Sequence, residues 1–140
     1  MMIERGVWLV PTLAAVYHII DLGTDGGIPA FAVEKAKRVF DSHIDSFRRA
    51  RDAGVRIAAG NDGGTPGNRA DNLISELKCL VQAGMSPADA LDAANRSAAV
   101  MLGMSDQIGA VGKGKIADLL VLNGDPLSDI SSVSKVHVVI

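Results

Sequence analysis

Two short apolar runs enclose a long amphipathic segment in the first half of the chain. Residues 6–13 form a continuous apolar run closed by Pro11, which is typical of a strand that is buried on both faces. Residues 32–53 place apolar side chains at every third or fourth position and charged ones between them, which predicts a helix. Gly54 is suited to end that helix, and residues 55–59 predict a second short strand.

The second half of the sequence predicts shorter helices, and then the spacing of its apolar residues changes. Ser86 can cap a helix start, and Pro87 suits the first helical position. From residue 108 onward, glycines separate short apolar runs, which favours strands. Residues 14–22, in the first half, fit either a helical turn or a loop. The elements predicted for the second half are helices over residues 71–83, 87–94 and 97–102 and strands over residues 116–122 and 136–140.

The order of these elements indicates an α/β protein. Strands and helices alternate in the front part, whereas the last two strands follow each other and indicate part of a separate small sheet. The 140 residues fit one small domain, and a hydrophobic content of 48% excludes a disordered chain. The balance of 14 basic against 16 acidic residues predicts no nucleic-acid partner.

Cysteine content and the length of the apolar runs indicate in which cellular compartment the protein is expected. The single cysteine, Cys79, excludes an internal disulfide framework and is expected in the core, with a reactive thiol as the alternative. No apolar run approaches the ~20 residues that cross a bilayer, and residues 1–5 lack the apolar part of a signal peptide. We therefore expect no membrane partner and a cytoplasmic location.

Motifs of several common enzyme classes do not occur in the sequence. The three histidines, His18, His43 and His137, form no His-x-His pair, so no self-contained metal site is predicted. The glycines of residues 109–114 have the wrong order for a dinucleotide loop, and residues 60–67 lack the Gly-Lys of a phosphate loop. His43 and His137 are expected to be surface or flanking residues, whereas His18 follows the first strand.

One carboxylate occupies a position where α/β proteins gather functional groups. Asp62 comes just after residues 55–59, at the carboxyl end of a predicted buried strand. A carboxylate there can bind a metal or accept a proton from water. An Asx turn or a helix cap in the glycine-rich loop explains the same residue equally well, and the sequence leaves both readings open.

Taken in order, these segments resemble the C-terminal part of the metal-dependent amidohydrolase superfamily, in its imidazolonepropionase-like and prolidase-like branch. Residues 7–13 are similar to the seventh barrel strand of that family, and residues 53–62 to the eighth strand with its terminal aspartate. The later matching segments are Glu76-Leu77, residues 83–91, residues 108–122 and Asp125-Pro126-Leu127.

The resemblance implies that the chain is an incomplete share of two domains. Residues 1–103 would be the C-terminal portion of a (β/α)8 TIM-type barrel, with strands 7 and 8 and their helices. Residues 104–140 would be the C-terminal strands of a small β-sandwich domain. Because a complete barrel takes ~250 residues, we expect open strand edges that self-associate or pair with the missing N-terminal part of the barrel.

The resemblance also implies metal-dependent hydrolysis of amide-type carbon–nitrogen bonds. The family aspartate that matches Asp62 contacts the metal and handles the proton of the attacking water, with zinc as the expected divalent metal. Asn61 departs from the Thr or Ser that is usual there. The family's histidine ligands have no counterpart in this sequence. We therefore expect the chain alone to be inactive; the alternative is a truncated, non-catalytic paralogue that binds or oligomerises.

Three polar residues are candidates for substrate binding. Tyr17, His18 and Arg69 lie in the segments that follow the two predicted strands. In barrel enzymes these segments carry the residues that determine substrate specificity. Arg69 can pair with a carboxylate, which favours a small-molecule or peptide-like substrate. The alternative is that all three are solvated loop residues.

Overall fold

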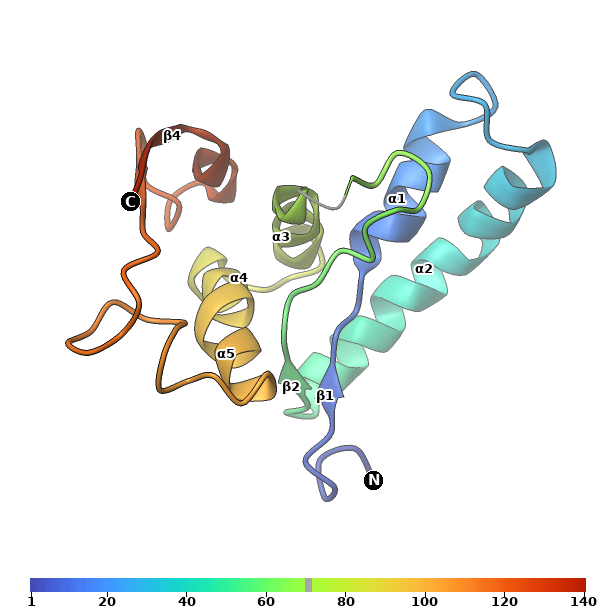
Figure 1. Cartoon of the computed structure of the whole chain (residues 1–140). Coiled ribbons are helices and arrows are strands. Elements are labelled where there is room, and N and C mark those ends of the chain that lie inside the picture. The colour runs from blue at the N-terminus through green and yellow to red at the C-terminus, as the bar shows by residue number, and fades with distance from the viewer. Residues whose placement is uncertain (70–71) are drawn as a thin grey trace.

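A pair of parallel strands forms the base of the N-terminal part (Figure 1). The computed structural model describes residues 1–69 and 72–140. Strand β1 (Trp8–Leu9) pairs with strand β2 (Arg56–Ile57), with Leu9 opposite Ile57. Both strands lie where the apolar runs predicted them. They are shorter than predicted, because each has only one neighbouring strand in the part of the chain that the structure describes.

The ladder between these strands ends where β2 turns toward a helix. The amide of Ala58 still donates to the carbonyl of Leu9 (N···O 3.1 Å), but the amide of Ala59 donates to the carbonyl of Ala93 (2.9 Å). Ala93 begins a π-helical turn, η1 (Ala93–Ser97). The strand pairing therefore ends where the backbone after β2 bonds to this helix and no longer to β1.

Two helices connect the strands. Helix α1 (Leu13–Leu22) occupies the segment that the sequence left open between a helical turn and a loop. Helix α2 (Ala30–Asp52) matches the predicted long helix and buries Phe47 against the strands and α3. Gly54 then ends the helix at φ 83°, a left-handed angle that favours glycine. The chain order strand, helices, parallel strand confirms an α/β arrangement.

Shorter helices cover the strand pair on the side of β2. Helix α3 (Leu73–Gln82) has Asn72 as its N-cap, and the predicted start at residue 71 lies outside the described residues. Helix α4 (Pro87–Asp92) begins as predicted, with the Ser86 hydroxyl accepting the Asp89 amide hydrogen (3.1 Å). The π-turn and helix α5 (Ala98–Met101) continue it, so the two predicted helices form one nearly continuous run.

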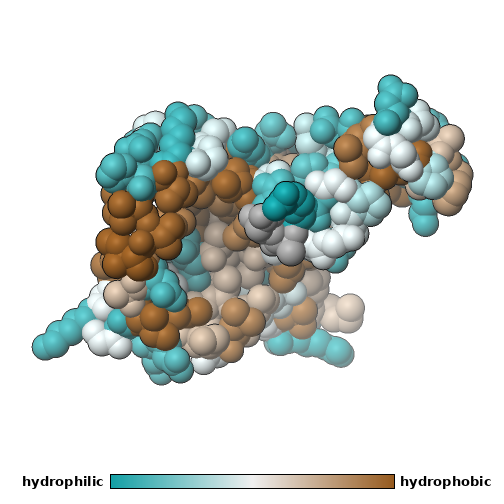
Figure 2. Space-filling model, turned by 45° about the horizontal axis from the view of Figure 1, so that its top comes forward, coloured by the Kyte–Doolittle hydropathy of each residue, from teal (hydrophilic) through white to brown (hydrophobic). Residues whose placement is uncertain are grey.

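The C-terminal segment forms a second sheet of its own. Strand β3 (Leu120–Leu122) pairs antiparallel with strand β4 (Val136–Val139), and the 3₁₀ helix η2 (Ile130–Ser134) lies between them. The strand predicted over residues 116–122 is too long at its start, because residues 116–118 have no ladder partner among the described residues. Apolar side chains gather over this sheet on the left of Figure 2. The exposed ones include Leu120, Val121, Val136, Val138, Val139 and Ile140.

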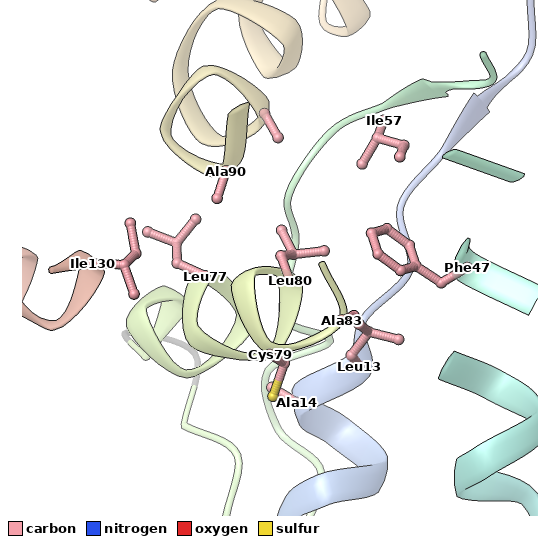
Figure 3. Packing of buried hydrophobic residues seen from close by; sticks show 11 residues of the cluster. Leu13, Ala14, Phe47, Ile57, Leu77, Cys79, Leu80, Ala83, Ala90 and Ile130 are labelled. Carbon is pink, nitrogen blue, oxygen red and sulfur yellow. The ribbon is translucent and has the colours of Figure 1, made fainter. Parts of the chain in front are cut away.

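The core lies where α3 meets the strands, α1, α2 and α4 (Figure 3). Leu80 of α3 is completely buried beside Phe47 and Leu13. Cys79 is buried on the same helix, and burial raises the pKa of its thiol to about 11. Its burial confirms the prediction of Cys79 as a core residue, and a thiol with so high a pKa stays protonated at neutral pH.

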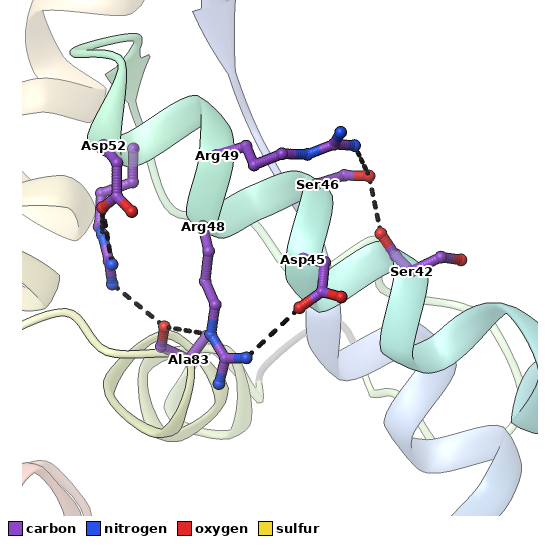
Figure 4. A network of polar contacts seen from close by, with 8 residues as sticks. Ser42, Asp45, Ser46, Arg48, Arg49, Asp52 and Ala83 are labelled. Atoms are coloured by element: carbon purple, nitrogen blue, oxygen red, sulfur yellow. Dashed lines mark hydrogen bonds and ion pairs between the residues drawn. The ribbon is translucent and has the colours of Figure 1, made fainter.

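Two arginines attach α2 to the C-terminal end of α3 (Figure 4). The carbonyl of Ala83 accepts hydrogen bonds from Arg48 Nε (3.2 Å) and Arg51 Nη1 (3.1 Å). Cationic groups at a helix C-terminus satisfy its free carbonyls and complement its dipole. Gly84 makes room for this contact, since a Cβ there would lie 2.6 Å from Arg51 Nη1.

We expect Leu80→Ala to lower the free energy of unfolding by about 2–5 kcal/mol, because it removes a buried side chain and leaves a cavity. Urea denaturation followed by the fluorescence of Trp8, the only tryptophan, measures this loss. Lys78→Ala, at an exposed position of the same helix, is the matched control. Equal stability of the two variants would contradict the placement of the core.

Candidate functional site

The carboxyl ends of β1 and β2 meet at one edge of the strand pair, because the strands are parallel. Thr12 follows β1 at φ 48°, and Asp62 follows β2 at φ 50°. Within residues 1–69 and 72–140 these are the only residues besides glycine with a positive φ. Left-handed conformations of such residues are strained and often occur at functional sites. This edge is therefore the candidate functional site.

A buried side chain organises the loop that contains Asp62. Asn68 is 1% exposed, and its Nδ2 donates to the carbonyls of Asn61 and of Asp62 (3.2 Å to the latter). The backbone closes the same loop, since the Asn68 amide donates to the Thr65 carbonyl and the Gly64 amide to the Asn68 carbonyl (both 2.9 Å). The backbone of Asp62 is thus held from inside the loop.

The Asp62 side chain itself is exposed. Among residues 1–69 and 72–140 its carboxylate makes no hydrogen bond, and the N-cap of the next helix, α3, is Asn72. An exposed carboxylate on a fixed backbone can accept a proton or bind a cation.

The three predicted substrate-binding residues lie on two elements that touch. Tyr17 and His18 are neighbours on α1, with ring centroids 5.6 Å apart in an edge-on arrangement. Tyr17 is exposed, while His18 is half-buried and its Nε2 has no partner within the described residues. The Asp62 loop packs on this helix, because a Cβ at Gly67 would lie 3.5 Å from His18 Cβ and would overlap the Leu22 side chain.

Arg69 ends the same loop. It is exposed, and its carbonyl accepts a hydrogen bond from Asn61 Nδ2 (2.9 Å). His18 therefore lies against the Asp62 loop at Gly67, Tyr17 stands beside His18, and Arg69 ends the loop. His137 lies exposed on β4, as expected of a surface residue.

Two residues near this edge were not predicted. Glu76 of α3 is completely buried, and its Oε2 accepts the amide hydrogen of Ala14 (2.8 Å) at the start of α1. His43 of α2, expected at the surface or a flank, is half-buried with Nε2 2.9 Å from the carbonyl of Pro11. The sequence signal for Glu76 was its place on the apolar face of its helix, one turn before Leu80.

Burial raises the pKa of Glu76, while hydrogen bonds from the amides of Ala14 and Leu13 lower it to a smaller extent. Desolvation thus outweighs the two backbone donors.

The described residues do not fit a complete metal centre. Within residues 1–69 and 72–140, no three His, Cys, Asp or Glu side chains are close enough to hold one ion. Catalytic zinc sites use three protein ligands, and Asp62 offers one carboxylate. No chemistry through a metal follows from these residues alone.

Among the residues that the structure describes, the fold and the edge define an α/β protein with an exposed aspartate in the loop after a parallel strand. The match to known families is specific: residues 1–140 match the Amidohydrolase family, and the chain belongs to that family.

Relatives of known name agree with this assignment. Ochratoxinase of Aspergillus niger is 32% identical over 133 residues, which are 93% of this chain and 26% of that protein. Imidazolonepropionase of Geobacillus kaustophilus is 33% identical over 71% of this chain and 24% of its own length.

Solved structures show the same backbone over nearly the whole chain. A Xaa-Pro dipeptidase with bound methionine superimposes with a TM-score of 0.87 at 34% identity, covering 99% of this chain and 34% of its own. A prolidase complexed with N-methylphosphonate-L-proline gives 0.86 at 31% identity, covering 99% and 34%. The chain therefore spans about a quarter to a third of the relatives that it matches.

The helices leave no candidate for a membrane span: across residues 1–69 and 72–140, none combines the length and the apolar character needed.

The raised pKa of Glu76 predicts a pH dependence of stability. Because the folded chain holds this proton more tightly than the unfolded chain, the contribution is fully present below the ordinary pKa of 4.5 and is lost as pH rises through the folded value. We therefore expect the free energy of unfolding of the wild type, minus that of Glu76→Gln, to fall from pH ~4 to pH ~8.

Urea denaturation at a series of pH values measures this difference. Leu80→Ala is the control, because it lowers stability from the same helix without removing a titratable group and should show no such trend. A difference that rises with pH for Glu76→Gln would contradict the raised pKa.

Proposed function

We propose that this chain is the C-terminal part of a metal-dependent hydrolase that cleaves amide-type carbon–nitrogen bonds, with Asp62 as its catalytic carboxylate. The single observation behind this proposal is the geometry of Asp62. Its backbone is held by the buried Asn68 just beyond a parallel strand, while its carboxylate stays exposed. Membership of the Amidohydrolase family supports the same reaction class.

In this proposal, β1 and β2 are the seventh and eighth strands of a (β/α)8 barrel. Residues 1–103 belong to the barrel and residues 104–140 to a small β-sandwich domain. Two observations support this division: β1 and β2 are parallel with helices between them, and β3 and β4 form a separate sheet.

Asp62 accepts a proton from the attacking water in the proposed reaction. If a divalent metal binds, Asp62 would supply one oxygen ligand, with zinc as the first candidate. The described residues do not complete such a site, so the other ligands would be supplied by a longer protein.

The proposed substrate is a small or peptide-like amide. The dipeptidase and the prolidase among the similar structures favour this class. Tyr17, His18 and Arg69 are the proposed substrate-binding residues, since they lie on α1 and at the end of the Asp62 loop. A carboxylate of the substrate is the natural partner for the exposed Arg69. The proposed location is the cytoplasm.

A chimera tests the catalytic role of Asp62. This chain replaces the matching third of the Xaa-Pro dipeptidase, and hydrolysis of a Xaa-Pro dipeptide is measured. We expect activity in the chimera and a loss of about 10²–10⁴-fold in kcat with Asp62→Asn, because the general base is removed.

Asp21→Asn, at an exposed position of α1, is the matched control and should keep the activity. An inactive parent chimera, or a chimera in which Asp62→Asn is as active as Asp21→Asn, would contradict the proposal.

The alternative function, a truncated paralogue that binds or oligomerises, has one observation in its favour. The β3–β4 sheet exposes apolar residues on β4 such as Val139, which is 74% exposed. Exposed apolar strands with free edges pair readily with other chains. The same surface suits the missing part of a longer protein.

We expect the isolated 140-residue chain to self-associate through this sheet. Light scattering should give a mass above that of the monomer, and Val139→Lys should lower it, because a charge on the strand opposes pairing. Val111→Lys, at a position that is 86% exposed outside the sheet, is the control. A monodisperse monomer with a sharp melt would refute the expectation.

A further inference from the structure

The corner between β1 and α1 has an unusual backbone. Thr12 adopts φ 48° and ψ 45°, the left-handed helical conformation. In that conformation the Cβ of an L-residue crowds the following carbonyl, and the second branch of threonine adds to the crowding. Such a residue persists only where its surroundings impose the conformation.

Two contacts flank Thr12, a partly buried one on the strand side and a buried one on the helix side. On the strand side, His43 Nε2 donates to the carbonyl of Pro11 (2.9 Å). On the helix side, the Glu76 carboxylate accepts the amide hydrogen of Ala14 (2.8 Å) and interacts with the amide of Leu13. Helix α1 lacks a side-chain cap of its own at Thr12, so Glu76 replaces that cap from another helix.

The chain retains this carboxylate at a cost. Glu76 is completely buried, and its second oxygen, Oε1, has no partner within the described residues. A buried polar group with an unpaired oxygen lowers the free energy of unfolding relative to an apolar side chain of similar volume. An apolar side chain cannot accept the amide hydrogens at the start of α1, however. Glutamate supplies the hydrogen-bond acceptor that these amides need.

The corner also bears on the Asp62 loop. Helix α1 starts at the corner, and the loop rests on α1 where Gly67 meets His18 and Leu22. Asn68, the next residue, holds the carbonyl of Asp62. A shift in the start of α1 would therefore be transmitted to the loop.

We propose that Glu76 is a positioning residue of the Asp62 edge: its carboxylate holds the left-handed corner at Thr12, and this corner fixes the helix on which the Asp62 loop rests. The proposal rests on the proposed function only for the catalytic role of Asp62. Its test measures no hydrolysis, so its failure is distinct from the failure of that function.

A double-mutant cycle on the 140-residue chain tests whether Glu76 acts through Thr12. Glu76→Ala should lower the urea midpoint, and Thr12→Gly should raise it, because glycine adopts the left-handed conformation without strain. In the Thr12→Gly background, Glu76→Ala should lower the midpoint by less than in the wild type. Contact residues with a shared role are coupled in this way, whereas independent packing losses add.

Thr24→Gly combined with Glu76→Ala is the matched control pair. Thr24 is exposed and has no positive φ, so its substitution should not raise the midpoint and the two effects should add. Additive effects of Thr12→Gly and Glu76→Ala, or a lower midpoint for Thr12→Gly, would overturn the proposal.

Hydrogen exchange at single amides tests the link to the loop. In Glu76→Ala the amides of Gly64 and Asn68 should exchange on the order of tenfold faster, because the support of their hydrogen bonds is loosened. Glu76→Gln keeps an oxygen acceptor for Ala14 and should restore near wild-type exchange.

If Glu76→Ala does not fold, the comparison of Glu76→Gln with the Thr12→Gly/Glu76→Ala double variant decides. The double variant should then fold with loop exchange close to that of Glu76→Gln. Unchanged exchange in Glu76→Ala, or fast loop exchange in Glu76→Gln, would overturn the proposal.

Discussion

The hydrogen bond from the amide of Ala14 to Glu76 joins the start of α1, which follows β1, to α3. The first amides of a helix have no partner within the helix, and at the start of α1 they are buried away from water. A carboxylate from α3 satisfies this need. The contact also places α3 against β1 and α1, where Leu80 and Phe47 complete the core. Helix α3 thus both accepts the amide hydrogens at the start of α1 and completes the apolar core.

The end of β2 shows the same use of a helix to complete a strand. The amide of Ala59 donates to the carbonyl of Ala93, at the point where the run from α4 becomes a π-turn. The chain then continues into the loop that Asn68 ties together. Both strand ends therefore depend on groups from outside the sheet, which explains why two strands of two residues can hold a defined edge.

The chain exposes strand edges and apolar side chains, and longer proteins of this family have additional sequence that could cover such surfaces. It spans 26% of ochratoxinase and 34% of the Xaa-Pro dipeptidase chain. The strand pair has open edges, and β4 is exposed along its whole length. The candidate site is incomplete in the same way. Among the described residues Asp62 is the carboxylate at this edge, and one ligand is fewer than a catalytic metal needs. Incomplete burial and an incomplete donor set thus occur together.

The sequence by itself determined the α/β order, the long helix α2, the start of α4 at Ser86 and the place of Asp62 after a strand. These are local properties: hydrophobic period, capping residues and a run closed by proline. The sequence did not decide between a helical turn and a loop for residues 14–22. The helix there is capped at its N-terminus by Glu76, which is 62 positions away from Ala14. The left-handed Thr12 and the partner of His43 could not be predicted from local sequence either. Both depend on contacts between elements far apart in the chain, so only the tertiary structure decided them.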